Sequence, residues 1–184
     1  MRLDDSAAHA ARDVQTTSGD GSPIVRAIDG VVARSPIVHT DHRGRVFELY
    51  QGLPGDDDFW AKPVVYSYVF SVRPHQVKGW GLHEHKDDRY SLISGELLTI
   101  LYDARLDSPT HGHIQKVVLG EQGARQLLIP TGVWHMNVNL SSTETLLVNH
   151  PTEPYRHEAP DRLLLPWDTP EIPFTLDSVF PIQR

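Results

Sequence analysis

Cysteine is absent from the sequence: none of the 184 residues carries a thiol. A disulfide framework, a thiolate nucleophile and a cysteine-ligated zinc site are therefore excluded. Long apolar runs are also missing, since no stretch approaches the roughly 18 apolar residues that a membrane-spanning helix needs. The N-terminal stretch lacks the apolar core of a signal peptide. We therefore expect a cytoplasmic protein without a membrane partner, whose chemistry depends on other side chains.

The chain carries fewer positively than negatively charged side chains. The chain has 17 Lys and Arg against 24 Asp and Glu, so its net charge is −7 with histidine neutral. A surface of that sign repels polyanions, which argues against nucleic acid or an anionic membrane as a partner. A local basic pocket for a phosphate group remains compatible with this balance.

Long amphipathic helical patterns are missing as well, and short strand-like segments take their place. Residues 1–22 are polar and turn-rich, and we expect them to form a disordered tail. For residues 23–184 we expect a single domain, in which short runs of Val, Ile, Leu and Tyr alternate with turns such as DHRG and PTG. Such spacing is typical of an all-β sandwich or barrel. The proline-rich stretch from Pro160 onward predicts an extended segment running over the domain.

Two histidines one residue apart, His83 and His85, form the densest cluster of reactive side chains. Side chains alternate between the two faces of a strand, so a strand over 80–85 would place both imidazoles on one face, roughly 6–7 Å apart. A third histidine, His135, follows a Pro-x-Gly turn in IPTGVWHMNVN. A β-barrel would be able to bring the three together.

These segments resemble the two cupin motifs. PTGVWHMNVN matches the second motif, PxGxxHxxxN, and HEHKDD followed by Gly95 is similar to the first motif, HxH…E…G. Asp88 stands where the first motif has its glutamate. The resemblance implies a cupin fold, which is a double-stranded β-helix or jelly-roll barrel.

Within the cupins, the chain resembles the dTDP-4-dehydrorhamnose 3,5-epimerase family. The matching segments follow the family order and are DHRGRVFE (41–48), GLH (81–83), YDARLDSPT (102–110), LIPTGVWH (128–135) and WDTP (167–170). The resemblance implies a homodimeric, metal-free isomerase that acts on a nucleotide-linked 4-keto-6-deoxy sugar. Its reaction removes a proton next to the ketone and returns one from the opposite face.

The resemblance also implies roles for individual residues. His83 matches the base, and a histidine has a suitable ordinary pKa of roughly 6.5. His135 matches the residue that stabilises the C4 oxygen as it gains charge. The carboxylate that orients the base falls close to Asp168. Implied substrate-binding residues are Arg43, Glu48, Arg89 beside the position of the family's lysine, Arg105, Asn149 and Tyr155.

Three positions depart from the family pattern, and two of the changes are toward metal-ligating side chains. The family's presumed acid, a tyrosine, is replaced by Asn149, whose side chain is not a proton acid. A pocket lysine is replaced by Asp88 and a glutamine by His85. A three-histidine, one-carboxylate set suits a divalent transition metal. That possible ligand set is His83, His85, Asp88 and His135.

Several interpretations stay open from the sequence. The first is a sugar-nucleotide epimerase of polysaccharide or glycan biosynthesis, in which water or Tyr90 replaces the missing acid. The second is a metal-dependent cupin enzyme, either a keto-sugar isomerase or an oxygenase, and the third is a sugar-binding cupin without catalysis. Two implied residues also have structural alternatives, because Arg105 can pair with Asp103 and Arg43 can belong to a turn.

Overall fold

The computed structural model describes residues 10, 14–21, 24, 26–50 and 58–178. Much of the tail predicted at residues 1–22 lies outside this range, and so do the last residues of the proline-rich segment. The regular secondary structure of the described chain consists of β-strands and of two short 3-10 helices, η2 (Asp58–Trp60) and η3 (Leu176–Ser178). None of the described helices is long and apolar enough to cross a membrane.

The strands are short and follow the apolar runs of the sequence. They are β1 (Val32–Arg34), β2 (Val38–Asp41), β3 (Gly44–Phe47), β4 (Tyr68–Val72), β5 (Val77–Leu82), β6 (Asp88–Ser94), β7 (Leu97–Asp103), β8 (Ile114–Leu119), β9 (Gln126–Ile129), β10 (Val133–Asn139), β11 (Thr145–Asn149) and β12 (Leu163–Leu164).

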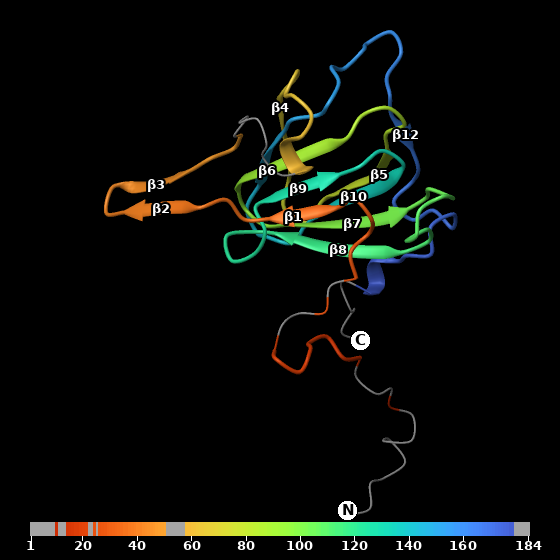
Figure 1. Cartoon of the computed structure of the whole chain (residues 1–184), viewed down its shortest axis with the longest axis horizontal. Coiled ribbons are helices and arrows are strands. Elements are labelled where there is room, and N and C mark those ends of the chain that lie inside the picture. The colour runs from red at the N-terminus through yellow and green to blue at the C-terminus, as the bar shows by residue number, and fades with distance from the viewer. Residues whose placement is uncertain (1–9, 11–13, 22–23, 25, 51–57, 179–184) are drawn as a thin grey trace, which may run out of the picture.

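Two five-stranded antiparallel sheets pack against each other (Figure 1). One has the order β1-β9-β6-β11-β4 and the other the order β12-β5-β10-β7-β8. Apart from β7 and β8, neighbouring strands within a sheet are not consecutive in the chain, because the chain crosses repeatedly from one sheet to the other. This jelly-roll-like sandwich confirms the all-β prediction and is the architecture that the cupin resemblance implies.

The main core fills the space between the sheets. Leu92, Leu101, Leu127 and Leu147 come from four different strands, and their side chains are fully buried there. Burial of each such side chain contributes about 1.5–3 kcal/mol relative to exposure. The core therefore fixes the relative position of β6, β7, β9 and β11, two of which carry residues of the site described below.

A second core covers the outer face of the β12-β5-β10-β7-β8 sheet. Trp80 on β5 is fully buried, and its ring centroid lies 6.1 Å from that of Phe174 in the C-terminal segment. Met136 and Ile172 belong to the same cluster. The described part of the proline-rich segment thus runs over the domain as predicted, with the two-residue edge strand β12 and η3 as its regular structure.

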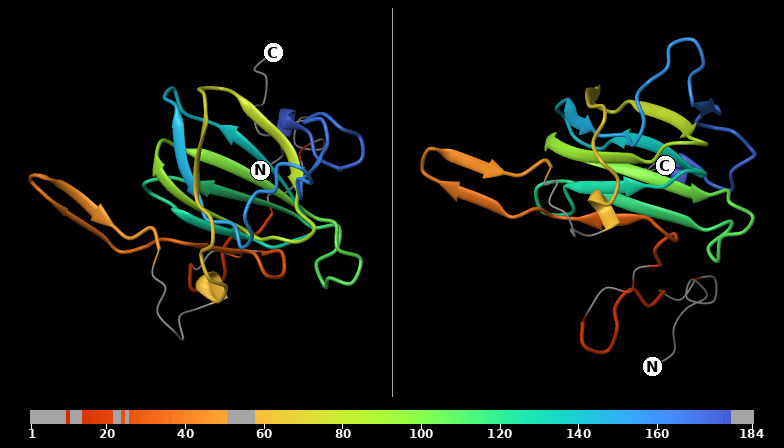
Figure 2. Two further views of the ribbon diagram at one scale, coloured as in Figure 1. Left: turned by 90° about the horizontal axis from the view of Figure 1, so that it is seen from above. Right: turned by 45° about the horizontal axis from the view of Figure 1, so that its top comes forward.

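A hairpin of β2 and β3 projects away from the sandwich, and it is drawn in orange in both views of Figure 2. Its register pairs Val38 with Phe47 and Asp41 with Gly44. The hairpin exposes an apolar residue, Val46, at 70% of its surface. Because it lies outside the body of the domain, the DHRGRVFE segment is held away from the space between the sheets.

The expected strand over 80–85 is wrong at its C-terminal half, because β5 ends at Leu82. The backbone amides of residues 84–86 instead donate hydrogen bonds to the carboxylate of Asp161. His83 and His85 therefore lie in a loop and do not follow strand alternation. His83 is 8% exposed, whereas His85 is exposed to solvent.

Candidate active site

A pocket of about 330 Å³ is lined by residues of both sheets and of the loops after β5 and before β12. Its titratable centre is formed by His83, Asp88 and His135. Its cationic side chains are Lys78, Lys86 and Arg162, and its aromatic ones are Tyr66, Tyr68, Phe70, Tyr90 and Tyr155. The mixture of apolar rings with a few converging polar groups is typical of a small-molecule site.

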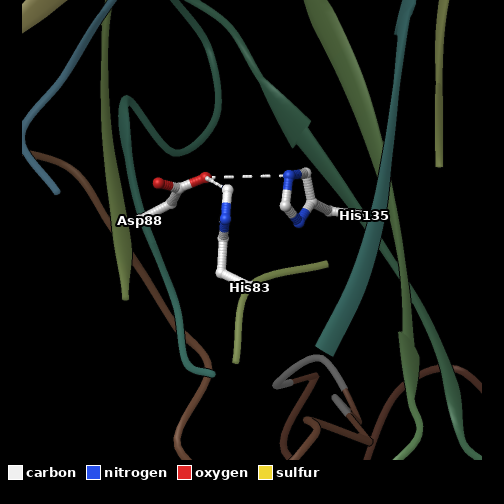
Figure 3. Close-up of side chains that lie close together, drawn as sticks. All are labelled: His83, Asp88 and His135. Atoms are coloured by element: carbon white, nitrogen blue, oxygen red, sulfur yellow. Dashed lines mark ion pairs between the residues drawn. The ribbon is translucent and has the colours of Figure 1, made fainter. Parts of the chain in front are cut away.

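The three titratable side chains point toward one another from three different elements (Figure 3). Asp88 begins β6, His135 lies in β10, and His83 follows the end of β5. The Oδ2 atom of Asp88 is 3.3 Å from Nε2 of His83 and 3.6 Å from Nε2 of His135. All three residues are less than 9% exposed, so their interactions are only weakly screened by water.

The close approach of His135 depends on a glycine in the neighbouring strand. His135 lies opposite Gly81 of β5 in the ladder. A Cβ atom at Gly81 would lie 3.3 Å from Nε2 of His135, which is tighter than ordinary contact. The glycine of the GLH motif therefore provides the room in which this imidazole ring reaches the pocket.

Each of the three side chains has a second partner behind it. The Nδ1 atom of His83 is hydrogen-bonded to the backbone carbonyl of Asp161. Nδ1 of His135 lies 3.4 Å from the carbonyl of Val133. Because a carbonyl only accepts, the neutral His83 ring carries its proton on Nδ1 and directs the lone pair of Nε2 into the pocket.

The partner behind Asp88 is Asn149, at the end of β11. Its Nδ2 atom donates to Oδ1 of Asp88 at 2.8 Å and to the hydroxyl oxygen of Tyr68 at 2.9 Å. Strand register explains this contact, because Asn149 pairs with Tyr68 of β4 on one side and with Tyr90 of β6 on the other. The side chain of Asn149 thus lies between a carboxylate and a tyrosine, both of which line the pocket.

Burial and neighbouring charge set the protonation states of these groups. Burial alone would raise the pKa of Asp88, but a hydrogen bond from His83, made when its Nε2 is protonated, and the positive charge of protonated His135 and His83 lower it to about 2. Burial lowers the pKa of His135 to about 4, although Asp88 opposes that shift. At neutral pH the pocket therefore holds an ionised carboxylate beside a neutral imidazole at His135.

The two tyrosines next to Asn149 stay protonated. Burial, together with the charge of Asp88, raises the pKa of Tyr68 to about 12. The same two causes raise the pKa of Tyr90 well above its usual range. Tyr90 is nearly inaccessible at 3%, whereas Tyr68 is 38% exposed. Since Tyr68 accepts a hydrogen bond from Asn149, its own hydroxyl proton remains available to a bound molecule.

The structure brings some of the sequence-predicted residues together. His83, Asp88, His135 and Tyr155 line the pocket. Asn149 is fully buried directly behind Asp88 and is not among the residues that line the pocket, so its substrate contact stays a prediction. His85 is the member of the predicted metal set that the described structure does not bring to this cluster, because it lies in the exposed loop.

Two of the predicted arginines are engaged elsewhere. Arg89 is 1% exposed and donates to the backbone carbonyls of Lys62, Pro63 and His150. It neighbours Asp88 on β6 and so faces the other side of the strand, with its guanidinium 5.0 Å from the ring centroid of Trp60. Period-2 alternation alone would have predicted this orientation.

Arg105 makes an ion pair with Asp103, whose Oδ1 is 2.8 Å from Nε of the arginine. Ser108 and Thr110 of the same segment donate to the same carboxylate at 2.6 and 2.7 Å. Gly132 of the PTG turn has φ of +77°, and a Cβ there would be 2.5 Å from Cγ of Arg105. The structural alternative considered for Arg105 therefore accounts for its contacts.

Three further predicted residues lie apart from the pocket in the described structure. The Arg43 side chain is 77% exposed and pairs with Asp41 on the projecting hairpin. Glu48, just after that hairpin, is also exposed. Asp168 is exposed and lines a separate depression formed by residues 167–177. Asp161, not Asp168, is the acidic residue whose backbone contacts the ring of His83.

Other pocket residues were missed by the sequence reasoning. They are Tyr66, Tyr68, Phe70, Lys78, Gly79, Lys86, Asn137 and Arg162. Asp161, which contacts His83 from behind, was missed as well. The alternating aromatic residues of YSYVF were an available signal, because period 2 places them on one face of a strand. The loop residues carry no comparable local signal, since the contacts of Asp161 with residues 83–86 join distant parts of the chain.

The profile of the dTDP-4-dehydrorhamnose 3,5-epimerase family matches residues 26–180. A probable low-salt glycan biosynthesis epimerase of Haloferax volcanii is 32% identical over 77% of this chain and 89% of its own length. A spore coat polysaccharide biosynthesis protein of Bacillus subtilis is 31% identical over 83% of this chain and 99% of its own length.

A solved structure has the same fold. A dTDP sugar isomerase from Desulfovibrio desulfuricans superposes with a TM-score of 0.71 at 28% identity, over 80% of this chain and 91% of the other. This likeness confirms the predicted cupin jelly roll.

Proposed function

The chain belongs to the dTDP-4-dehydrorhamnose 3,5-epimerase family, and on that premise we propose that it epimerises a nucleotide-linked 4-keto-6-deoxyhexose. The observation that carries the proposal is the buried pair His83 and His135 beside Asp88, in a pocket of the size of a sugar ring with its substituents. The names of the two relatives refer to glycan and polysaccharide biosynthesis. We assign this chain to the same kind of pathway, in the cytoplasm.

His83 is the proposed base. Its Nδ1 proton is held by the carbonyl of Asp161, so the lone pair of Nε2 is available to take a proton from the carbon next to the ketone. The electron pair of the broken C–H bond forms an enolate, with negative charge on the C4 oxygen. The imidazolium produced at His83 lies against the ionised Asp88, which stabilises it.

Tyr68 is the proposed proton donor on the other face of the sugar. By the resemblance, Asn149 stands at the position of the family's tyrosine, and its Nδ2 atom donates to the hydroxyl oxygen of Tyr68 on the adjacent strand at 2.9 Å. The donor is thereby moved from β11 to β4. Tyr68 gives its proton to the enolate carbon and regains one from solvent, to which it is partly open.

Lys78, Lys86 and Arg162 are the proposed anion-binding groups. All three line the pocket, and a guanidinium binds phosphate oxygens in a bidentate manner. They would hold the diphosphate of the nucleotide and stabilise the enolate oxygen close to His135. No cofactor is part of this proposal, in agreement with the family resemblance.

A homodimer is proposed from the position of the hairpin. Arg43 and Val46 project away from the body of their own domain, where an exposed basic and an exposed apolar residue would contact a second copy. In a dimer, Arg43 would be placed to bind the nucleotide in the partner's pocket. Sedimentation equilibrium tests this, and a monomeric mass at micromolar concentration would contradict it.

The function is tested with dTDP-4-dehydro-6-deoxyglucose in heavy water, with deuterium at C3 and C5 read by NMR. We expect label at one or both carbons, and the number of labelled carbons distinguishes single from double epimerisation. His83→Ala should abolish labelling, and His85→Ala, in the exposed part of the same loop, is the matched control. Nucleotide-sugar binding without any label would indicate a binding protein instead.

A further inference from the structure

The donor atoms of His83, Asp88 and His135 have the spacing of a metal site. All three ligand atoms lie within 4.8 Å of one another, and the two measured edges are 3.3 and 3.6 Å. Metal–nitrogen and metal–oxygen bonds of about 2.0–2.2 Å give an edge of about 3.4 Å in a tetrahedral site. The side chains therefore need little rearrangement to hold one ion.

The groups behind the donors also match a metal site. Metal-binding imidazoles usually donate their other N–H to a carbonyl or carboxylate, which fixes the tautomer and aims the ligating nitrogen. His83 does so to the carbonyl of Asp161, and His135 faces the carbonyl of Val133. The carboxylate oxygen of Asp88 that is not a candidate ligand, Oδ1, likewise accepts a hydrogen bond from Asn149.

The donor set selects the class of ion. Two imidazole nitrogens and one carboxylate oxygen suit zinc and neighbouring transition metals, whereas Mg²⁺ and Ca²⁺ prefer oxygen ligands. All three donors are buried, and the pocket leaves a further position open toward a bound molecule. Burial strengthens the attraction between the ionised Asp88 and a divalent cation.

A second group of donors, Glu84, His85 and Asp161, is a weaker candidate. Glu84 and His85 are exposed, and the carboxylate of Asp161 already accepts three backbone amides. In the described part of the chain, these are the two groups whose donor atoms approach closely enough to share an ion. His85 therefore serves as the test of which group binds.

We propose that His83, Asp88 and His135 bind a divalent transition metal ion and that the bound ion inhibits the epimerase. The proposed inhibition rests on the proposed function, in which the lone pair of His83 Nε2 takes the substrate proton. An ion at that lone pair removes the base. Binding of the ion and proton abstraction are then mutually exclusive in one molecule.

Binding is measured first, independently of activity. Protein treated with EDTA and dialysed is titrated with Co²⁺, whose visible absorption reports tetrahedral coordination, and Zn²⁺ is then used to displace it. We expect one ion per chain. Asn149→Ala, which removes an outer partner, should weaken binding about 10- to 100-fold, and Asp88→Asn should weaken it further. His85→Ala should bind as the unmodified chain does.

Inhibition is measured next by deuterium incorporation into the 4-keto sugar, with EDTA and with Zn²⁺ at saturation. We expect labelling with EDTA and its loss with Zn²⁺. Absence of Co²⁺ binding, or loss of binding in His85→Ala alone, would overturn the site. Unchanged or increased labelling with bound Zn²⁺ would overturn the inhibition. If no labelling occurs even with EDTA, the proposed function and the inhibition both fail, while the Co²⁺ titration still decides the site.

Discussion

Two buried aspartates, Asp88 and Asp103, lie in comparable surroundings and differ in how their oxygens are satisfied. Asp103 receives two hydrogen bonds from the Arg105 guanidinium and one each from Ser108 and Thr110. Asp88 receives one firm hydrogen bond, from Asn149, and its other oxygen faces two imidazole nitrogens. A carboxylate such as that of Asp103, whose oxygens all accept hydrogen bonds, has a structural role. The Oδ2 atom of Asp88 faces imidazole nitrogens and can still accept a proton or bind an ion or a substrate.

The comparison also separates the family motifs. The segment YDARLDSPT and the glycine of PTG build the Asp103 network, in which Gly132 makes room for Arg105. The GLH and VWH segments place the two imidazoles at Asp88. Motifs that belong to one family pattern therefore serve different purposes. Mutations in the Asp103 network should lower stability, and mutations at the two imidazoles should lower activity.

The largest expected effect is on activity, at His83. His83→Asn should lower the rate of deuterium incorporation about 100- to 10,000-fold, because general base catalysis is lost. The midpoint of urea unfolding should change less than it does in Asp103 variants. NMR labelling and urea titration of the same preparation check both statements. A labelling rate within a few-fold of the unmodified protein would contradict the assignment of the base.

The next effect is on stability, at Asp103. Asp103→Asn should lower the free energy of unfolding by about 3 kcal/mol, because the charged arginine loses its partner in a largely buried network. The labelling rate per folded molecule should stay close to that of the unmodified chain. Urea titration measures the loss, and a variant that is as stable as the parent but inactive would break the comparison.

A smaller effect is expected at Tyr68. Tyr68→Phe should lower the rate of net inversion about 100-fold, the lower range for general acid catalysis, while C–H exchange in heavy water persists because the base remains. Tyr90→Phe, on the other side of Asn149, is the matched control. If Tyr90→Phe loses inversion and Tyr68→Phe does not, the donor is the buried tyrosine suggested by the sequence.

The fold was predictable from the sequence to a large extent. Short apolar runs between turns predicted an all-β domain, and the two motifs with their glycines predicted the jelly roll that the comparison with a solved structure confirms. The structure also brings His83, His135 and Asp88 of the predicted site together in one pocket. The all-β class depends on local patterns, in which period-2 alternation and turn residues carry the information. The jelly roll and the site residues were instead implied by the resemblance to the cupin and epimerase motifs.

The parts that were not predictable depend on contacts between distant segments. Asp161 binds the amides of residues 84–86 and thereby ends β5 before the HxH pair, so His85 is left outside the pocket. Tyr68 meets Asn149 only through the register of β4 and β11. No spacing within either segment indicates such a pairing. Patterns within one segment of the sequence locate the site, and contacts between distant segments determine which of its residues face each other.

The smallest expected effect is the pH dependence of stability that comes from Asp103. Burial alone would raise the pKa of Asp103, but hydrogen bonds from Arg105, Ser108 and Thr110 lower it well below its usual range. A carboxyl with a depressed folded-state pKa contributes stability that is fully present above the unfolded pKa of roughly 3.9 and is lost as the pH falls below it. Unfolding free energies from urea titrations at about pH 6, 4 and 3 should therefore decrease toward acid in the parent chain. In Asp103→Asn the decrease should be shallower, since that group no longer titrates. Equal slopes for the two proteins would show that the network around Asp103 does not hold its carboxylate in the ionised form, and the contrast with Asp88 would then lose its basis.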